Sequence, residues 1–343
     1  MEEIYTDALR GILSDNCNPT VVRAIEAGGS AEGLWEAVES SGFADVLLTE
    51  EDGGAGLSLI QAFELIEMCG AFVVPVPLAE TMVARALIAQ TGQPRPGGSV
   101  ALATGRYMPD GELVCDAVTC GRTANWVLVA TGNTSAVLLP ADAAVQGEAV
   151  AKLDARLAWP TAVQRTGAEV RLTANLRELH ASVLAVQLAG ALGEVFTRTL
   201  AFANERQQFG RQIGKFQAIQ HQLSVIAEHV SAARMAAQLG CSGDRPDPLR
   251  IAVAKARTGE AALEVAALSH SIHGAIGFTE EFDLQLFTRR LHAWRQAAGS
   301  EAWWQDVLGA ALLDRPDRLS LELIRATTDA SSSVALAIMK EHT

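Results

Sequence analysis

The chain has 343 residues, a length typical of about two domains and sufficient to bury a large core without disulfides or metal ions. Its 27 basic and 40 acidic residues give a net charge of −13, which argues against a protein that binds nucleic-acid backbones. Hydrophobic residues make up 49% of the chain and aromatic residues only 5%, which is typical of a mostly helical globular protein.

Residues 1–95 are predicted to form an N-terminal helical domain. The first residues, MEEIYTDALRGIL, lack the basic and apolar regions of a secretory signal, so we expect a cytoplasmic protein. An acidic, glycine-rich loop follows at Glu50–Gly56. No strand precedes it and its acids would repel a phosphate, so we interpret it as a loop that needs unusual backbone angles. A helix is predicted from about Leu78 to Gln90.

Residues 96–174 change character and predict a small β domain. Short apolar runs are separated by Gly, Pro, Asn and Asp, which is the pattern of strands joined by turns. The predicted strands lie at residues 100–103, 113–115, 126–130 and 136–139.

Residues 175–313 are predicted to form a C-terminal helical bundle. Apolar residues recur every three or four positions from Phe209 to Ala237, which predicts one long helix, and a second runs to about Ser271. The longest nearly apolar stretch, Ser182 to Phe196, is too short to span a bilayer and predicts a buried helix with no membrane insertion. Residues 314–343 form a C-terminal extension to which we assign no function.

The five cysteines are an odd number and show no metal-ligand spacing, so we expect reduced thiols in a cytosolic protein and no metal site.

Two motifs in the third segment resemble the acyl-CoA dehydrogenase family. Asn204–His221 reads NERQQFGRQIGKFQAIQH, and the family signature is ERxxFG followed by FQAIQH. His270–Glu281 reads HSIHGAIGFTEE, and the family usually has QIHGGxGFTEE. The loop Leu48–Gly56 is similar to the LPEEYGGxG loop of the same family, and the resemblance covers about residues 30 to 310 in the same order.

The resemblance implies a mainly α subunit of α–β–α order, with an N-terminal helical domain, a β-barrel-like middle domain and a C-terminal four-helix bundle. Such subunits normally form tetramers that bind FAD across a subunit interface. They catalyse α,β-dehydrogenation of an acyl-CoA: a carboxylate removes the α-proton, and the β-hydrogen leaves as hydride to the flavin. The electrons then pass to an electron-transferring flavoprotein.

The first motif carries the strongest cofactor prediction. By resemblance, Arg206, Gln208, Phe209 and Gln217 reach the ADP half of an FAD that a neighbouring subunit holds. The guanidinium of Arg206 offers a planar fork of donors that suits a pyrophosphate, and a surface ion pair is the alternative. Gln217 would lie about three helical turns beyond Arg206 if the backbone between them were regular.

The second motif departs from the family pattern. Ser271 stands at the family's glutamine and Ala275 at its second glycine, and Gly274 would allow close approach of the backbone to the cofactor. His273 either lines the site or packs as a structural histidine.

The usual catalytic glutamate is missing. Counting forward from the second motif places its position at Ala298, before Gly299-Ser300, and Glu301 lies just beyond. Some members carry the base 26 residues before the arginine, which is His180 here, with Glu178 two residues away.

The β domain is also depleted of the family's flavin-binding residues. The strand that should carry Thr/Ser-Glu-Pro reads Ala101–Gly105, and the Trp-Ile-Thr strand is reduced to Val118–Gly121.

We therefore expect half of an active site. The chain resembles the short subunit of heterotetrameric α2β2 acyl-CoA dehydrogenases of bacterial steroid side-chain degradation, in which a catalytic partner subunit would supply the flavin-binding strands and the glutamate. One alternative is a self-sufficient homomeric dehydrogenase that uses Glu178 or His180. The other is a scaffold subunit that binds no flavin.

Overall fold

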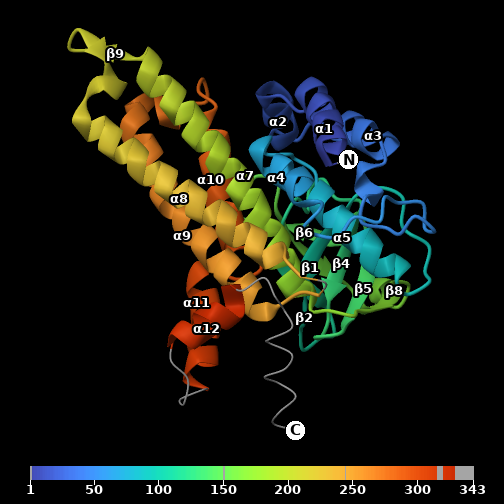
Figure 1. The fold of residues 1–343 in the computed structure, drawn as a ribbon. Coiled ribbons are helices and arrows are strands. Elements are labelled where there is room, and N and C mark those ends of the chain that lie inside the picture. The colour runs from blue at the N-terminus through green and yellow to red at the C-terminus, as the bar shows by residue number, and fades with distance from the viewer. Residues whose placement is uncertain (1, 150, 244, 315–319, 329–343) are drawn as a thin grey trace.

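The computed structural model describes residues 2–149, 151–243, 245–314 and 320–328. Helices form the N-terminal part and the bundle, and two small sheets lie between them in the sequence and beside them in space (Figure 1). The N-terminal elements are α1 (Glu2–Asn16), α2 (Pro19–Glu26), α3 (Glu32–Ser40), η1 (Phe43–Asp45), α4 (Phe63–Ala71) and α5 (Leu78–Ala89).

The loop between η1 and α4 confirms the prediction of unusual backbone angles. Gly53 and Gly56 have φ of 83° and 65°, in the left-handed region that favours glycine. A Cβ at Gly54 would lie 2.3 Å from the carbonyl oxygen of Leu48, so only glycine fits there.

All four predicted apolar runs are strands. One sheet has the order β1-β4-β5-β8, in which β1 and β4 are parallel and the other pairs antiparallel. The other sheet has the antiparallel order β2-β3-β7-β6. Side chains of both sheets, such as Val127 and Leu157, share one core, so the sheets face each other. The strands are β1 (Val100–Thr104), β2 (Arg106–Tyr107), β3 (Leu113–Val118), β4 (Trp126–Ala130), β5 (Ser135–Pro140), β6 (Val145–Gly147), β7 (Ala155–Trp159) and β8 (Ala168–Arg171), with the short helix α6 (Thr161–Gln164) between the last two.

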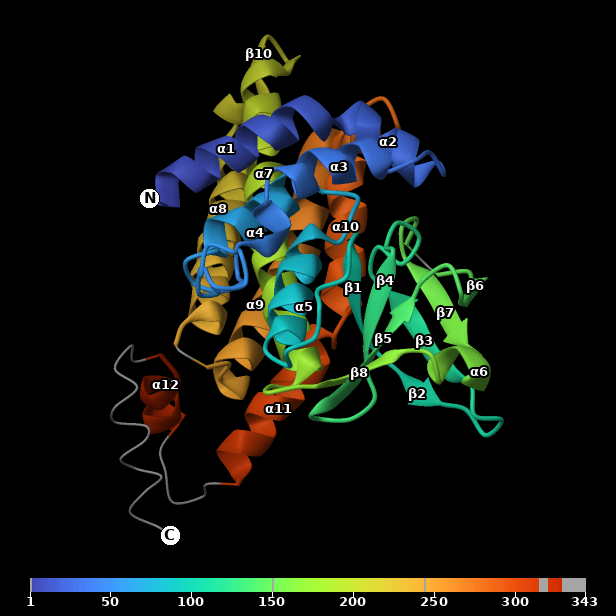
Figure 2. The same ribbon diagram turned by 90° about the vertical axis from the view of Figure 1, so that its right-hand side faces the viewer.

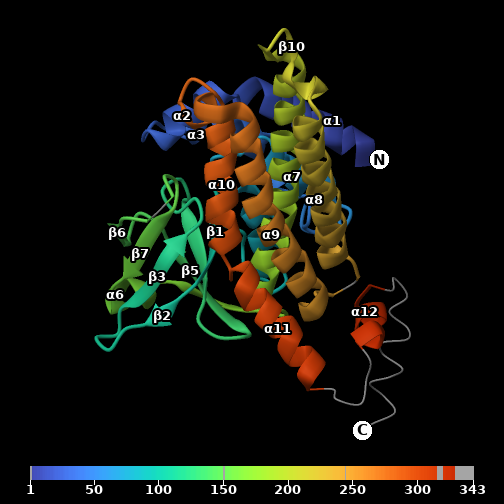
Figure 3. The same ribbon diagram turned by 90° about the vertical axis from the view of Figure 1, so that its left-hand side faces the viewer.

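Four helices form the C-terminal bundle (Figure 3). They are α7 (Leu176–Glu205), α8 (Gln217–Cys241), α9 (Pro248–His273) and α10 (Leu284–Gln296), followed by α11 (Glu301–Leu313) and α12 (Ser320–Thr328). Local sequence sets where they begin: the side chains of Asn175 and Asp247 accept hydrogen bonds from the first backbone N–H groups of α7 and α9.

Helix α7 is the central helix of the bundle. It is long and apolar enough to cross a membrane by length and composition, but 83% of its most apolar stretch is buried inside the protein. The core helix of a globular protein passes the same test, and this burial agrees with the buried helix predicted at Ser182–Phe196.

The prediction of one long helix from Phe209 was wrong in its first turns. Helix α7 ends at Glu205, and a hairpin of β9 (Gln207–Gln208) and β10 (Arg211–Gln212) and the short helix η2 (Ile213–Lys215) precede α8. Phe209 and Gly210 have φ of 52° and 81°, the two positive values of a type I′ hairpin turn, and no right-handed helix passes through such residues.

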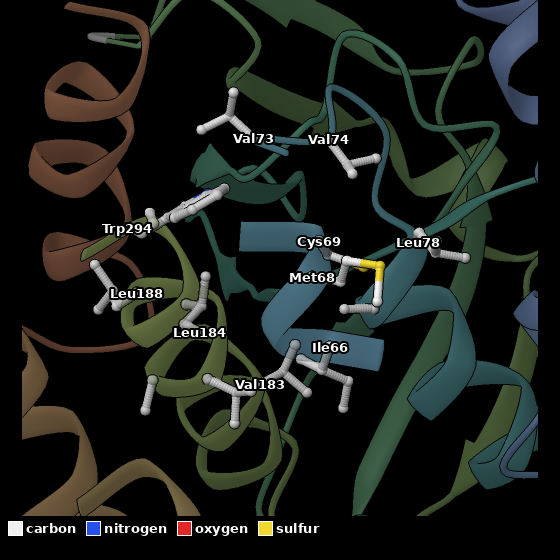
Figure 4. Close-up of a cluster of buried hydrophobic side chains, with 14 of the residues drawn as sticks. Ile66, Met68, Cys69, Val73, Val74, Leu78, Val183, Leu184, Leu188 and Trp294 are labelled. Carbon is white, nitrogen blue, oxygen red and sulfur yellow. The ribbon is translucent and has the colours of Figure 1, made fainter. Parts of the chain in front are cut away.

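A cluster of buried apolar side chains lies where α4 crosses α7 (Figure 4). Ile66, Met68 and Cys69 of α4 lie against Val183, Leu184 and Leu188 of α7, with Trp294 of α10 beside them. Gly70 and Gly190 sit at the crossing, and a Cβ on either would lie 1.9 Å from a carbonyl oxygen of the other helix. All five cysteines are free and buried, as expected for reduced thiols.

Candidate functional site

The residues of the first motif gather at the free end of the bundle, where the hairpin projects beyond the helices (Figures 1 and 2). Arg206 caps α7, Gln208 and Phe209 lie on the hairpin, and Gln217 opens α8. All four side chains are exposed, and those of Arg206, Gln208 and Gln217 make no hydrogen bond or ion pair with the part of the chain that the structure describes. The ion pair weighed as the alternative for Arg206 is therefore not formed within the described chain.

Phe209 is the most exposed large apolar side chain of this end. It is 92% exposed on a backbone with positive φ, a conformation that costs about 1–2 kcal/mol for a residue other than glycine. Its ring meets the edge of Phe216 at 6.2 Å, and the guanidinium of Arg211 stacks on Phe216 at 4.2 Å. The hairpin therefore holds Phe209 outward at an energetic cost, which points to a contact outside this chain.

The second motif lies at the same end of the bundle, because α9 runs antiparallel to α8. Ser271 is exposed near the end of α9, and its Oγ accepts a hydrogen bond from the Gln222 amide of α8 at 3.4 Å. Gly274 ends the helix with φ 67° and ψ −148°, angles that only glycine adopts freely. Gly274 and Ala275 are exposed, and a Cβ at Gly274 would meet nothing within 4 Å.

His273 is a packed structural histidine. Its ring is 5% exposed and stacks on Phe202 at 4.3 Å, with Phe282 at 5.0 Å. Nδ1 lies 2.8 Å from the Ser269 carbonyl oxygen, so Nδ1 carries the hydrogen and donates it. Burial lowers the pKa of His273, which keeps the ring neutral.

The position of the missing glutamate lies at the opposite end of the bundle, in the turn between α10 and α11. Ala298 and Gly299 have φ of 55° and 107°, and Ser300 caps α11 by accepting from the Trp303 N–H. A methyl group cannot accept a proton, so Ala298 itself cannot serve as a base.

A buried lysine fixes this turn. Lys255 of α9 is fully buried, and its Nζ donates to the carbonyl oxygens of Arg295 at 2.8 Å and Gly299 at 2.9 Å. Glu301, at the start of α11, forms an ion pair with Arg295. Its carboxylate is therefore already paired within the chain. Burial lowers the pKa of Lys255 to about 7. No motif marks this lysine, because its contacts come from residues 40 and 44 positions away.

The two alternative bases lie in different settings, and His180 lacks that of a catalytic group. His180 is 6% exposed in the core of the bundle, and burial together with the Lys255 charge lowers its pKa to about 3. Glu178 lies in the first turn of α7, where partial burial and the charge of Asp247 raise its pKa. With a pKa of about 3, the His180 imidazole is a very weak base, and its burial keeps it from contact with a ligand.

A cavity of about 960 Å³ opens where the sheets meet α10. Its walls include Ala117 of β3, Ala293 and Ala297, together with the carboxylates of Glu26, Asp116, Glu148 and Asp154. Arg289 and Arg290 also line it, and both form ion pairs with Glu26. Of the degenerate strand Val118–Gly121, Thr119 is buried and does not line this cavity.

The two ends of the bundle are far apart. Lys255 and Ser271 are separated by 16 residues of one helix, which is about 24 Å along its axis. The two sequence motifs therefore lie together at one end, whereas Ala298 and the large cavity lie toward the other. Residues at the two ends of one subunit are therefore too far apart to contact the same reacting atoms.

These residues fit one half of an FAD. Exposed amides, a free guanidinium and a glycine with a left-handed backbone suit a phosphate and an adenosine. The other end has no carboxylate at Ala298, and the walls of its cavity carry both acidic and basic side chains.

The helical bundle and the paired sheets give the chain the α–β–α order of a single subunit, with both motifs in its C-terminal part. A family model described as "Acyl-CoA dehydrogenase, C-terminal domain" matches residues 174–313. Residues 174–313 therefore match the C-terminal domain of the acyl-CoA dehydrogenase family, and the chain is similar to acyl-CoA dehydrogenases along most of its length.

Relatives and solved structures agree with this assignment along almost the whole chain. The acyl-CoA dehydrogenase IpdE2 of Mycolicibacterium smegmatis is 29% identical over 311 residues, which is 87% of this chain and 94% of that one. The Tcur3481-Tcur3483 steroid ACAD G363A variant has a TM-score of 0.77 and 24% identity, covering 93% of this chain and all of that chain. The ChsE4-ChsE5 complex of Mycobacterium tuberculosis has a TM-score of 0.78 and 18% identity, covering 91% and 97%. These structures show the fold.

Proposed function

We propose that this chain is a subunit of a heteromeric, FAD-dependent acyl-CoA dehydrogenase, and that it supplies the ADP-binding half of the FAD site to a catalytic partner. One observation carries the proposal: Arg206, Gln208 and Gln217 are exposed at one end of the bundle and have no side-chain hydrogen bond or ion pair among the described residues, while alanine stands at the expected base position at the other end. Two solved structures of this fold are named as pairs of proteins, which supports a heteromer.

The residues of this chain would bind and orient the cofactor. FAD would supply the hydride acceptor for α,β-dehydrogenation of an acyl-CoA, and the partner would supply the base that removes the α-proton. Arg206 would pair with the pyrophosphate, and Gln208 and Gln217 would donate hydrogen bonds. Phe209 would cover apolar surface of the cofactor or its partner. Ser271, Gly274 and Ala275 would lie beside the same ADP group.

The wider setting follows from the same proposal. The assembly would be an α2β2 heterotetramer in the cytoplasm that passes electrons to an electron-transferring flavoprotein. A bulky steroid acyl group is the substrate we favour, because one of the structures of the same fold is named a steroid ACAD.

The test is reconstitution of the full chain with a longer family member that retains the glutamate. We expect the chain alone to be colourless and inactive, and the complex to hold FAD and oxidise acyl-CoA. Arg206→Gln should weaken FAD binding by the complex at least tenfold, because it removes a charge-assisted pair. Arg10→Gln, on an exposed face of α1, is the matched control and should change nothing.

Two results would favour the alternatives. Bound FAD and turnover by this chain alone would establish a self-sufficient homomer that uses another base. An Arg206→Gln complex with unchanged FAD affinity would support a scaffold subunit that does not touch the cofactor.

A further inference from the structure

A second cavity, of about 320 Å³, lies away from the cofactor end and away from the large cavity beside α10. It is enclosed by α5, the loop after η1, the first turn of α7 and the connection between α8 and α9, which Figure 2 shows on the same side of the molecule. It shares no lining residue with the large cavity. Neither motif of the sequence lines it, and the proposed function leaves it unused.

The wall of this cavity is apolar. Val83 and Leu87 of α5, Leu179 of α7 and Ile251 of α9 are buried and form its base. Leu47, Leu57 and Leu59 of the loop after η1 form its outer wall. They are only half-buried, because the cavity opens toward solvent there. This is the composition of a small-molecule site, in which an apolar body is buried and a few polar groups set its orientation.

The polar groups lie at the rim and favour an anion. Arg245 is the one charged side chain among the described lining residues, none of which is Asp or Glu, although the chain carries a net charge of −13. Its guanidinium makes no hydrogen bond or ion pair with the described residues. Gln90 accepts from the Thr173 hydroxyl at 3.0 Å, which leaves its amide NH2 group as a second donor.

The volume limits the size of the ligand. A cavity of about 320 Å³ lies at the small end of the range for small-molecule sites. A carboxylic acid with a medium-length alkyl chain suits that size better than a whole acyl-CoA.

We propose that this cavity binds a free medium-chain carboxylic acid, with its alkyl chain against Leu87 and Ile251 and its carboxylate paired with Arg245. A free acid fits better than an acyl-CoA, because its charge lies directly at the end of the alkyl chain. The thioester carbonyl at that position is uncharged, and the phosphates of coenzyme A lie a pantetheine length beyond it. The site shares no lining residue with the two motifs or with the large cavity, and it is formed by this chain alone.

Calorimetric titration of the full chain with octanoate, 1-octanol and octanoyl-CoA tests the proposal. Octanoate should bind at one site with a Kd below about 1 mM. Arg245→Gln should weaken octanoate about tenfold and leave 1-octanol unchanged, because only the acid pairs with the guanidinium. Arg10→Gln is the matched control and should leave octanoate binding unchanged.

Filling the cavity separates it from other apolar surfaces. Ala86→Phe should abolish binding of both octanoate and 1-octanol. If Ala86→Phe has a lower melting temperature than the wild type, Gln90→Trp at the exposed rim replaces it as the filling variant. Octanoate binding that survives both variants, or no saturable binding to the wild type, overturns the proposal. Competition between octanoyl-CoA and octanoate overturns it as well, because the cavity would then belong to the substrate site. None of these outcomes involves FAD or a partner, so the proposed function stands or fails separately.

Discussion

The crossing of α4 and α7 gives a sharp test of the packing, since one helix carries both the change and its control. Gly190 and Gly193 are both glycines of α7 with helical backbone. A Cβ at Gly190 would lie 1.9 Å from the Glu67 carbonyl oxygen, whereas a Cβ at Gly193 would meet nothing within 4 Å. The same mutation to alanine therefore has opposite expected effects one turn apart.

The magnitude follows from two terms. Alanine in a helix interior is favoured over glycine by about 1 kcal/mol, so Gly193→Ala should raise the free energy of unfolding by up to that amount. At Gly190 the same gain in helix propensity is opposed by a clash. The new Cβ would lie 1.9 Å from the Glu67 carbonyl oxygen, so α4 must move by about 1.1 Å to lengthen that distance to 3.0 Å. Such a shift separates Ile66 from Val183 across the crossing, and overpacking typically costs about 1–3 kcal/mol or more. We expect Gly190→Ala to be destabilised by about 2 kcal/mol.

Urea denaturation followed by tryptophan fluorescence measures both variants, because Trp294 is buried in this cluster (Figure 4). A midpoint shift at constant slope reports stability. The midpoint should fall for Gly190→Ala and rise for Gly193→Ala. A Gly190→Ala chain as stable as the wild type would refute the reasoning, since the helices would then not cross as closely as the structure shows.

Three further changes test the two ends of the bundle. Phe209→Ala should alter the free energy of unfolding by less than about 0.5 kcal/mol, because the ring is 92% exposed, yet lower the FAD content of the reconstituted complex. Burial lowers the pKa of Lys255 to about 7 from 10.5, so the unfolded chain binds more protons between these values. Stability should therefore rise with pH across that window, by up to about 1.4 kcal/mol per pH unit, and Lys255→Met should remove that rise in denaturation curves measured from pH 7 to 10. Ala298→Glu should give the chain alone no acyl-CoA-dependent reduction of added FAD, measured by flavin absorbance, because its β domain lacks the flavin-binding residues.

Local patterns were enough to predict much of the fold. The strand at residues 126–130 is an apolar run between turn residues, and the glycines after Glu51 show the left-handed angles that the sequence predicts. The helix predicted from Phe209 was wrong, because apolar spacing of three or four also arises across a hairpin and a 3-10 turn. Gly210 was the available signal, since Phe-Gly between polar residues permits a two-residue turn.

The motifs that define the candidate site can be recognised in the sequence, but the arrangement of their residues cannot. Arg206 and Gln217 come from a recognisable motif, whereas the contact of Lys255 with the Gly299 carbonyl joins residues far apart in the sequence. Burial of His180 beside that lysine likewise follows from helix packing, which single-sequence periodicity does not resolve. The octanoate-sized cavity is formed by four separate segments and leaves no motif in any of them.

Under the proposed function, the separation of the two ends would explain how one half of an active site is kept while the other is lost. Residues at the hairpin and at the end of α9 are about 24 Å along the helix from the turn that Lys255 holds, and they share no hydrogen bond with it in the described chain. Changes at sites that far apart, with no shared partner, act on stability and binding nearly independently. Alanine at position 298 therefore leaves the hairpin intact, and a subunit lacking the base can still bind the cofactor of a partner that retains one.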